Sequence, residues 1–351
     1  MVDNYNEFML KKLNKFNKTF IIAEAGSNHL KNFNRVKKLI DIASDAGADA
    51  IKFQSFFADE IATKNKKYNK IDNKFRKYAS NLYSFYKNLE LPKEFYKKIF
   101  NYCRKKKIVF LTSIFGFKSF NFLKKEIHYV KIASFEANYY ELLEEIIKNK
   151  KFLIISTGCF NEKKIFELKK FFKKKKFKKF AIMHCGSAYP LPFEEANLKY
   201  IKKLKKIFPD NFIGYSDHTL GISSCIAAVT LGASIIEKHF TISKKDNSPD
   251  SFFSLNHVEL KQMIEGIRQL EISLGKEKKI ISNEVKKMKK GMRSYYSLFD
   301  YKKGQKIAKG MFKALRPHIK NSLEAGDFFK FLNKRLKRNI IKGEVLCKKH
   351  L

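Results

Sequence analysis

The sequence predicts a (β/α)₈ barrel followed by a small second domain, on three observations. Eight short runs of apolar, mainly β-branched or aromatic residues alternate with segments of helical spacing over about 240 residues, the usual size of such a barrel. Polar residues follow every one of these runs, as expected where strands deliver their carboxyl ends to one catalytic face. No G-x-G-x-x-G motif follows the first run, which counts against the alternative, an open doubly wound sheet that binds a dinucleotide.

The predicted strands are the runs 20–23, 50–53, 108–111, 129–132, 152–155, 180–183, 212–214 and 234–236. Helical spacing between them is clearest at 36–46, 93–105, 140–147, 195–207 and 222–231, and the amphipathic segment 255–275 is predicted to be the last barrel helix. An insertion at 57–91, rich in Lys, Asn and Tyr, separates the second strand from its helix. It is a candidate lid.

Four segments follow from this pattern. Residues 1–17 are predicted to be an N-terminal extension, 18–275 the barrel, 276–292 a Lys-rich linker and 293–351 a second unit. The second unit has short strand-like runs and predicted glycine turns at Gly304, Gly326 and Gly343. Because a unit of about 59 residues is only marginally stable alone, we expect it to pack on another surface.

Composition restricts the class of protein. The chain has 351 residues, of which 44% are hydrophobic, enough for one large core and one smaller core. No run of about 18 uninterrupted apolar residues is present, and the N-terminal residues lack the pattern of a secretory signal, so we expect neither a membrane span nor export. Five cysteines without C-x-x-C spacing suit a reducing cytoplasm better than a disulfide framework or a zinc knuckle.

The formal net charge of +40 raises a second class of function, nucleic-acid binding. A dedicated nucleic-acid-binding protein concentrates its charge on one face and uses arginine for phosphates and base edges. Here nearly all basic residues are lysines, and they recur in almost every helical segment, as on solvated helix faces. We therefore expect no specific nucleic-acid binding, although the charge should attract small anions over long distances.

A predicted strand–helix–strand unit at 211–241 ends each of its strands on a histidine, His218 and His239. Parallel strands joined by a helix bring their carboxyl ends to the same side, so the two imidazoles are expected to face one another. A single buried histidine is more often structural than a ligand. Matched placement at two neighbouring strand ends favours a site for one divalent metal ion.

All eight predicted strands end in polar groups, and the residues are Glu24, Asn28, Lys52, Gln54, Thr112, Ser113, Lys131, Ser134, Glu136, Ser156, Thr157, His184, Ser187, Tyr189, Ser216, His218, Glu237 and His239. Lys52 and Lys131, ringed by hydroxyl groups, suit a small substrate that carries both carboxylate and phosphate. A lysine that snorkels to solvent is the alternative for Lys131. Glu24 and Glu237 are predicted equally well as general acids or bases and as counterions of the lysines.

Several long motifs, in order, carry a family resemblance: IIAEAGSNH (21–29), GADAIKFQSF (47–56), VKIASFEA (130–137), ISTG (155–158), GYSDHTLG (214–221) and GASIIEKHFT (232–241). The chain resembles the sialic acid synthase family, the phosphoenolpyruvate-dependent synthases of nonulosonic acids, over nearly its whole length. Its C-terminal part is similar to the antifreeze-like (SAF) domain of these enzymes.

The resemblance implies condensation of phosphoenolpyruvate with the open-chain aldehyde of an N-acetylated amino-sugar, with release of phosphate. It implies that His218 and His239 hold Mn²⁺ or Mg²⁺, which polarises the aldehyde oxygen. Positions that match binders of phosphoenolpyruvate are Lys52, Ser113, Lys131, Ser134, Ser156, Ser187 and Ser216, and positions near the metal or the sugar are Glu24, Gln54, Tyr189, Glu237 and Asp250. Glu136, at the end of the fourth predicted strand, is a further predicted substrate-binding residue. The resemblance also implies a domain-swapped homodimer in which Arg316 reaches the acetamido group in the partner's barrel.

Within the family, the segments 130–137, 187–190 and 249–255 are most similar to the pseudaminate branch. Its sugar is a 6-deoxy sugar with a second acetamido group, so it offers a methyl group where the sialate precursor offers a hydroxyl. Phe135 or Phe252 near that methyl would favour it, by about 1–3 kcal/mol. The alternatives are that these phenylalanines belong to an ordinary core, and that the sugar is the sialate or legionaminate precursor. A degenerate barrel that serves only as a scaffold conflicts with the full set of strand-end residues.

Overall fold

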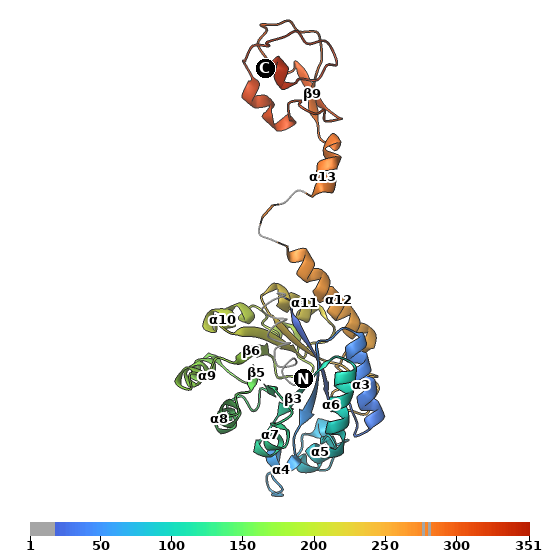
Figure 1. Cartoon of the computed structure of the whole chain (residues 1–351), viewed down its shortest axis with the longest axis vertical. Coiled ribbons are helices and arrows are strands. Elements are labelled where there is room, and N and C mark those ends of the chain that lie inside the picture. Colours follow the sequence, from blue (N-terminus) through green and yellow to red (C-terminus); the bar gives the residue numbers. More distant parts are fainter. Residues whose placement is uncertain (1–17, 276–277, 280–281) are drawn as a thin grey trace. The chain divides into compact units, whose positions relative to one another are not determined.

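The computed structural model describes residues 18–275, 278–279 and 282–351, which divide into two compact units at the Gly275–Lys276 boundary (Figure 1). The predicted N-terminal extension, 1–17, lies outside the described residues. The first unit is a closed barrel of parallel strands in sequential order, surrounded by helices, so the predicted (β/α)₈ fold is confirmed. None of the described helices is long and apolar enough to cross a membrane.

The eight barrel strands begin within one residue of the predicted runs, and all except β4 extend further at their polar ends. They are β1 (Phe20–Gly26), β2 (Ala50–Ser55), β3 (Val109–Ile114), β4 (Tyr129–Ile132), β5 (Phe152–Ser156), β6 (Phe180–Cys185), β7 (Phe212–Asp217) and β8 (Ile235–His239). Most of the extra residues are polar, and those that point into the barrel line a cavity rather than a core. The apolar runs therefore locate the strands but underestimate their length.

Helices cover the outside of the barrel and follow the strands in turn (Figure 1). They are α3 (Phe33–Asp45), α6 (Tyr96–Lys105), α7 (Phe117–Leu123), α8 (Tyr140–Lys148), α9 (Glu162–Lys174), α10 (Tyr200–Ile207), α11 (Ser223–Thr230) and α12 (His257–Leu274). Asparagine begins several of them: the side chains of Asn32, Asn161 and Asn256 each accept a hydrogen bond from a backbone N–H of the first turn. Asn256 and Glu259 also form a capping box.

The insertion at 57–91 forms ordered structure. It contains α4 (Ala58–Ile61), the 3₁₀ turn η1 (Asn73–Phe75) and α5 (Leu82–Leu89), and the turn η2 (Lys93–Phe95) leads from it into α6. The Tyr78 hydroxyl donates to the carbonyl of Ser248, at 3.3 Å, in the loop that follows β8. The candidate lid thus lies against another loop at the carboxyl end of the barrel.

The interior of the barrel changes from apolar to polar along the strands. Phe20, Ile22, Leu111, Ile154 and Met183 fill its amino-terminal part and are fully buried. Alternate residues of β1 point to the helix layer, where a second and larger apolar cluster lies between strands and helices. Because apolar residues fill the amino-terminal part of the interior, ionisable side chains that point inward are confined to the carboxyl end.

The second unit is built around a small antiparallel sheet of β9 (Ser294–Ser297) and β10 (Phe312–Leu315). Its own core consists of Ile307, Phe312, Leu323, Phe328, Leu336, Ile340 and Leu346. The predicted linker contains α13 (Asn283–Lys287) and the turn η4 (Met288–Gly291). Gly304 and Gly343 have the positive φ of glycine turns, at 89° and 78°, whereas Gly326 lies inside the 3₁₀ helix η5 (Ala325–Phe331), which the sequence did not predict.

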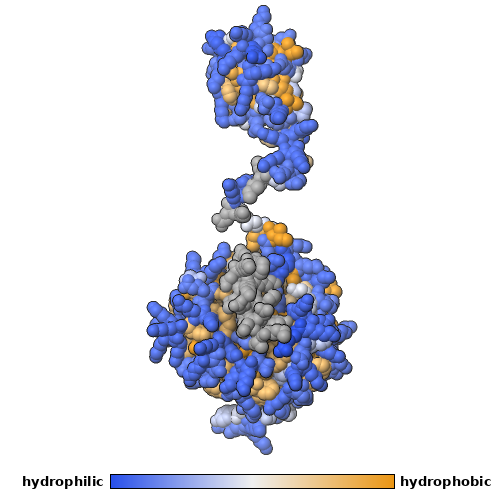
Figure 2. Space-filling view, viewed as in Figure 1, coloured by the Kyte–Doolittle hydropathy of each residue, from blue (hydrophilic) through white to orange (hydrophobic). Residues whose placement is uncertain are grey.

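Figure 2 shows hydrophilic side chains spread over the visible face of each unit, with apolar side chains in scattered patches. Lysines dominate the exposed helix positions, for example Lys169, Lys170, Lys173 and Lys174 on α9. This distribution matches the expectation of solvated helix faces.

Replacement of Phe172 by Ala should lower the free energy of unfolding by about 3–5 kcal/mol, because the ring is buried and stacks on Phe180 at a centroid distance of 4.1 Å. Phe166→Ala on the same helix is the matched control: its ring is 45% exposed, and we expect a change of about 0.5 kcal/mol. Urea unfolding followed by circular dichroism measures both. Similar losses in the two variants would contradict the packing of α9 described here.

Candidate active site

A small cavity opens among the carboxyl ends of the barrel strands and collects most of the predicted site residues. Its lining includes Glu24, Lys52, Gln54, Ser113, Lys131, Ser134, Ser156, Tyr189, Ser216, His218, Glu237 and His239, together with Phe115, Ala133 and Cys185. The register of the barrel explains this convergence. Glu24 on β1 pairs with Lys52 on β2 and with His239 on β8, and Ser113 on β3 pairs with Lys131 on β4.

Lys52 is fully enclosed by polar partners. Its ammonium group donates to the Ser113 hydroxyl at 2.9 Å and lies 3.0 Å from Glu24 Oε2 and 3.5 Å from Glu237 Oε1. The Lys52 side chain is only 4% exposed. Lys52 is therefore held as a cation inside the barrel.

Lys131 mirrors this arrangement on the other side of Glu237. Its ammonium group donates to the Ser156 hydroxyl at 2.7 Å and lies 3.4 Å from Glu237 Oε1. The alternative of a lysine that snorkels to solvent is wrong, because the Lys131 side chain is 3% exposed. Glu237 also accepts a hydrogen bond from the Ser216 hydroxyl at 2.9 Å, so one carboxylate joins both lysines.

The two glutamates differ in the proton that they hold near neutral pH. Burial raises the pKa of Glu24 to about 7, although Lys52 opposes the shift. Burial acts in the same direction on Glu237, but Lys131, Lys52 and the Ser216 hydroxyl outweigh it and lower its pKa to about 2. Glu237 is a permanent anion, whereas Glu24 can exchange a proton near pH 7, a division of labour typical of acid–base sites.

His218 and His239 face one another with ring centroids 5.5 Å apart and an interplanar angle of 55°. Two imidazoles on one ion hold their centroids roughly 5–6.5 Å apart, given metal–nitrogen distances of about 2.0–2.1 Å. Nδ1 of His218 lies 2.6 Å from the Gly186 carbonyl oxygen, which leaves Nε2 for a ligand. Nδ1 of His239 is buried without a hydrogen-bond partner, and burial lowers the pKa of this ring well below its usual value, so that it is a neutral donor of a lone pair.

These two rings fit the divalent ion that the sequence predicts. Within the described part of the chain, no three His, Cys, Asp or Glu side chains converge as a complete set of ligands. An ion held by His218 and His239 would therefore take its other ligands from water or substrate oxygens, which is the arrangement of an open catalytic site.

Aromatic rings form one wall beside the histidines. The ring centroids of Tyr189 and His218 lie 4.1 Å apart, and those of Phe253 and His239 lie 5.0 Å apart. Phe253 was not predicted as a site residue, because its loop has no periodic pattern that would indicate the direction of the side chain. Phe252 and Phe135 are 55% and 66% exposed, so the interpretation of these two residues as ordinary core is wrong.

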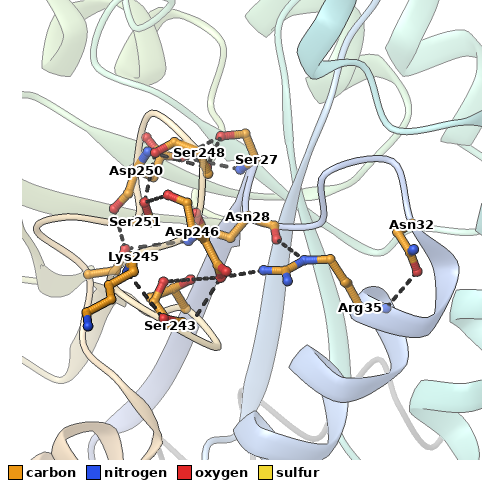
Figure 3. Close-up of polar contacts among 12 residues, drawn as sticks. Ser27, Asn28, Asn32, Arg35, Ser243, Lys245, Asp246, Ser248, Asp250 and Ser251 are labelled. Carbon is orange, nitrogen blue, oxygen red and sulfur yellow. Dashed lines mark hydrogen bonds and ion pairs between the residues drawn. The ribbon is translucent and has the colours of Figure 1, made fainter. Parts of the chain in front are cut away.

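Asp250 approaches the cavity over Gly26. Its Oδ2 accepts hydrogen bonds from the Ser27 N–H and hydroxyl groups, at 3.3 and 3.0 Å (Figure 3). A Cβ atom on Gly26 would lie 2.6 Å from that oxygen and 3.5 Å from both Glu24 Oε1 and His239 Cε1. Gly26 also has a positive φ of 49°, so both its conformation and its surroundings favour glycine.

The loop that carries Asp250 is fastened to the turn after β1 at a second point (Figure 3). Arg35 on α3 forms an ion pair with Asp246 and donates through Nε to the Asn28 carbonyl oxygen at 3.4 Å. Asp246 Oδ2 also accepts from the Ser243 N–H at 3.2 Å. The loop is therefore anchored to β1 and α3.

Eight predicted residues lie outside the lining of the cavity: Asn28, Thr112, Thr157, His184, Ser187, Asp250, Glu136 and Arg316. Ser187 lines a neighbouring groove, where its hydroxyl accepts from the Cys159 thiol at 3.5 Å. Asp250 lies next to Gly26, with its Oδ2 hydrogen-bonded to Ser27. Glu136 is half-buried with Oε2 unpartnered, and Arg316 is exposed on the second unit.

Cys185 is a site residue that the sequence did not predict. It lines the cavity with its sulfur 3.8 Å from His218 Nδ1. Its place at the end of β6, one residue after His184, was the available signal.

A model of the NeuB family matches residues 39–279. Among curated relatives, the pseudaminic acid synthase of Campylobacter jejuni serotype O:2 is 36% identical over 94% of this chain and 95% of its own length. The N,N'-diacetyllegionaminic acid synthase of the same strain is 37% identical over 94% of this chain and 99% of its own length. The crystal structure of the N-acetylneuraminic acid synthetase of Leptospira borgpetersenii superposes with a TM-score of 0.68 at 32% identity, over 77% of this chain and 90% of that one.

Replacement of Glu136 by Gln should stabilise the protein at pH 8 but not at pH 4. Burial raises the pKa of Glu136 from 4.5 to about 7, so the folded protein binds this proton more tightly than the unfolded chain. The cost of burying the carboxylate is thus absent below about pH 4.5 and complete above about pH 7. Urea midpoints at the two pH values measure it, with Glu265→Gln on the exposed face of α12 as the control. Equal midpoints of wild type and Glu136→Gln at pH 8 would exclude burial as the cause.

Proposed function

The chain belongs to the NeuB family, and from that premise we propose that it is a pseudaminic acid synthase. It condenses phosphoenolpyruvate with 2,4-diacetamido-2,4,6-trideoxy-L-altrose and water to give pseudaminic acid and phosphate. The observation that carries the proposal is the pair of buried lysines that share Glu237 beside two facing imidazoles, at the catalytic end of a barrel. Pseudaminic acid synthases of Campylobacter jejuni and Helicobacter pylori, at 36% and 32% identity, support the same assignment.

Lys52 and Lys131 bind the carboxylate and phosphate of phosphoenolpyruvate. With Glu24 protonated and Glu237 ionised, two ammonium groups face one fixed negative charge, and an anion completes the balance. The hydroxyl groups of Ser113 and Ser156, which now accept from these lysines, can rotate to donate to substrate oxygens. The assigned donors are Ser113, Ser134, Ser156, Ser187 and Ser216.

His218 and His239 would hold a divalent ion, Mn²⁺ or Mg²⁺, which supplies Lewis-acid polarisation of the sugar's aldehyde oxygen. In the reaction, C3 of phosphoenolpyruvate bonds to the aldehyde carbon, water adds at C2, and phosphate leaves. We assign Glu24 as the residue that exchanges a proton with these reacting groups, since its pKa is about 7. Gln54 orients Glu24 by donating to Oε1 at 3.2 Å, while Glu237 is the counterion of the lysines.

The sugar is assigned to the space beside Tyr189 and the exposed rings of Phe135 and Phe252. Apolar rings favour the methyl group of the 6-deoxy sugar over a hydroxyl by about 1–3 kcal/mol. Glu136, Asp250 and Arg316 are further candidates for contacts with the sugar, Arg316 from a partner subunit in a domain-swapped homodimer. We place the enzyme in the cytoplasm, in line with its free cysteines in the described residues.

The purified protein should release phosphate from phosphoenolpyruvate only when 2,4-diacetamido-2,4,6-trideoxy-L-altrose and a divalent cation are both present. N-acetylmannosamine, which lacks this methyl group, should give at most about a tenth of that rate when it is assayed in parallel. The legionaminate precursor carries the same methyl group and differs in stereochemistry, and it should also react more slowly. Because a legionaminate synthase is as similar overall, the three sugars form the deciding comparison. A clear preference for either other sugar would refute the pseudaminate assignment but leave the synthase chemistry in place.

Replacement of His218 by Ala should reduce phosphate release by at least about two orders of magnitude, because it removes one of two imidazole ligands. His257→Ala is the control, since His257 is exposed at the start of α12 and should leave the rate unchanged. The rate is measured at saturating Mn²⁺ and phosphoenolpyruvate. An unimpaired His218→Ala variant would reject the metal assignment.

A further inference from the structure

The two strands that carry the histidines hold a second polar cluster on their outer side. Side chains alternate between the two faces of a strand, so successive cross-strand pairs of β7 and β8 alternate as well. Ser216 pairs with Glu237 and faces the cavity, and the next pair, Asp217 with Lys238, faces the helix layer. His218 and His239 come directly after this outward pair.

Asp217 and Lys238 form an ion pair that is closed off from water. Lys238 Nζ lies 2.6 Å from Asp217 Oδ2, and the two side chains are 1% and 0% exposed. Neighbours complete the shell: the Tyr215 hydroxyl donates to Oδ1 at 2.9 Å, and the Cys225 thiol of α11 donates to Oδ2 at 3.2 Å. A buried ion pair adds little stability compared with apolar residues of the same volume, so stability alone does not account for it.

The same ion pair holds the chain on both sides of His218. The backbone N–H of Thr219 donates to Asp217 Oδ1 at 2.9 Å, and Lys238 Nζ donates to the Thr219 carbonyl oxygen at 2.5 Å. His218 is therefore the middle residue of a segment that is fixed at both ends. Lys238 immediately precedes His239, so the pair connects the backbones at both imidazoles.

We propose that Asp217 and Lys238 are positioning residues that hold the imidazoles of His218 and His239 at the separation required by one shared divalent ion. The inference rests on the metal site of the proposed function. Its physical basis is that two ligands on different strands bind one ion tightly only when both backbones are held within a fraction of an ångström of the required geometry. Hydrogen bonds of the β7–β8 ladder end at this pair, so the side chains continue the connection where the ladder stops.

The test measures Mn²⁺ binding to the full chain without substrates, from the electron paramagnetic resonance signal of free Mn²⁺. The variants are Asp217→Asn, Lys238→Met and the double variant, which retain side-chain volume but remove one or both charges. We expect the dissociation constant of each to rise about 10–100-fold, the usual effect of losing a partner that orients ligands. The KM for phosphoenolpyruvate should change little, because Lys52 and Lys131 are untouched.

The double variant separates positioning from stability. Each single variant leaves one buried charge unpaired and should lower the melting temperature, whereas the double variant removes both charges and should recover most of that loss. Its affinity for Mn²⁺ should nevertheless remain low, because the ion pair between the strands and the Lys238 hydrogen bond to the Thr219 carbonyl oxygen are gone. Recovery of both properties in the double variant would overturn the proposal.

Arg268→Met is the matched control at the other end of the barrel. Arg268 pairs with Asp49, which precedes β2, at 3.2 Å, so this variant should lower the melting temperature without changing the affinity for Mn²⁺. Dissociation constants of all Asp217 and Lys238 variants within about twofold of wild type, or an equal loss in Arg268→Met, would overturn the inference alone. Failure of the wild-type protein to bind Mn²⁺ would instead overturn the proposed metal site, and the inference with it.

Discussion

The carboxylate of Glu237 lies between two buried ammonium groups, and the rest of the cavity depends on this interaction. Removing Lys52 and Lys131 from water inside the barrel would cost several kcal/mol each without a partner. Glu237 and the surrounding hydroxyl groups offset that cost, and the cavity has a positive balance when Glu24 holds its proton. A substrate that carries carboxylate and phosphate is therefore attracted to a site that is already organised, rather than to flexible lysines on the surface.

Barrel register is what places these charges. Glu24 lies opposite both Lys52 and His239, so a carboxyl group that can exchange a proton is next to a buried ammonium group and to the imidazoles. The outward pair of Asp217 and Lys238 uses the same register on the other face of the strands. Side chains of β7 and β8 therefore point alternately into the cavity and toward the helix layer, because the side-chain direction of a strand repeats every two residues.

Much of this could be predicted from the sequence, because residues at equivalent positions of parallel strands meet at one end of a barrel. That rule located both histidines and both lysines, and alternation along a strand would also have paired Asp217 with Lys238. It could not locate Phe253, whose side-chain direction depends on a loop without a repeat. The difference between Glu24 and Glu237 was also out of reach, since it depends on distances to two ammonium groups and not on residue type.

Phe20, Leu111 and Met183 pack across the amino-terminal end of the barrel and close it to substrates and products. Molecules therefore enter and leave the cavity only at the carboxyl end of the strands. Both reactants and both products must use it in turn, so whatever sits deepest is the last to be freed and the first that must be loaded. The depth at which each molecule binds then sets the order of binding and release.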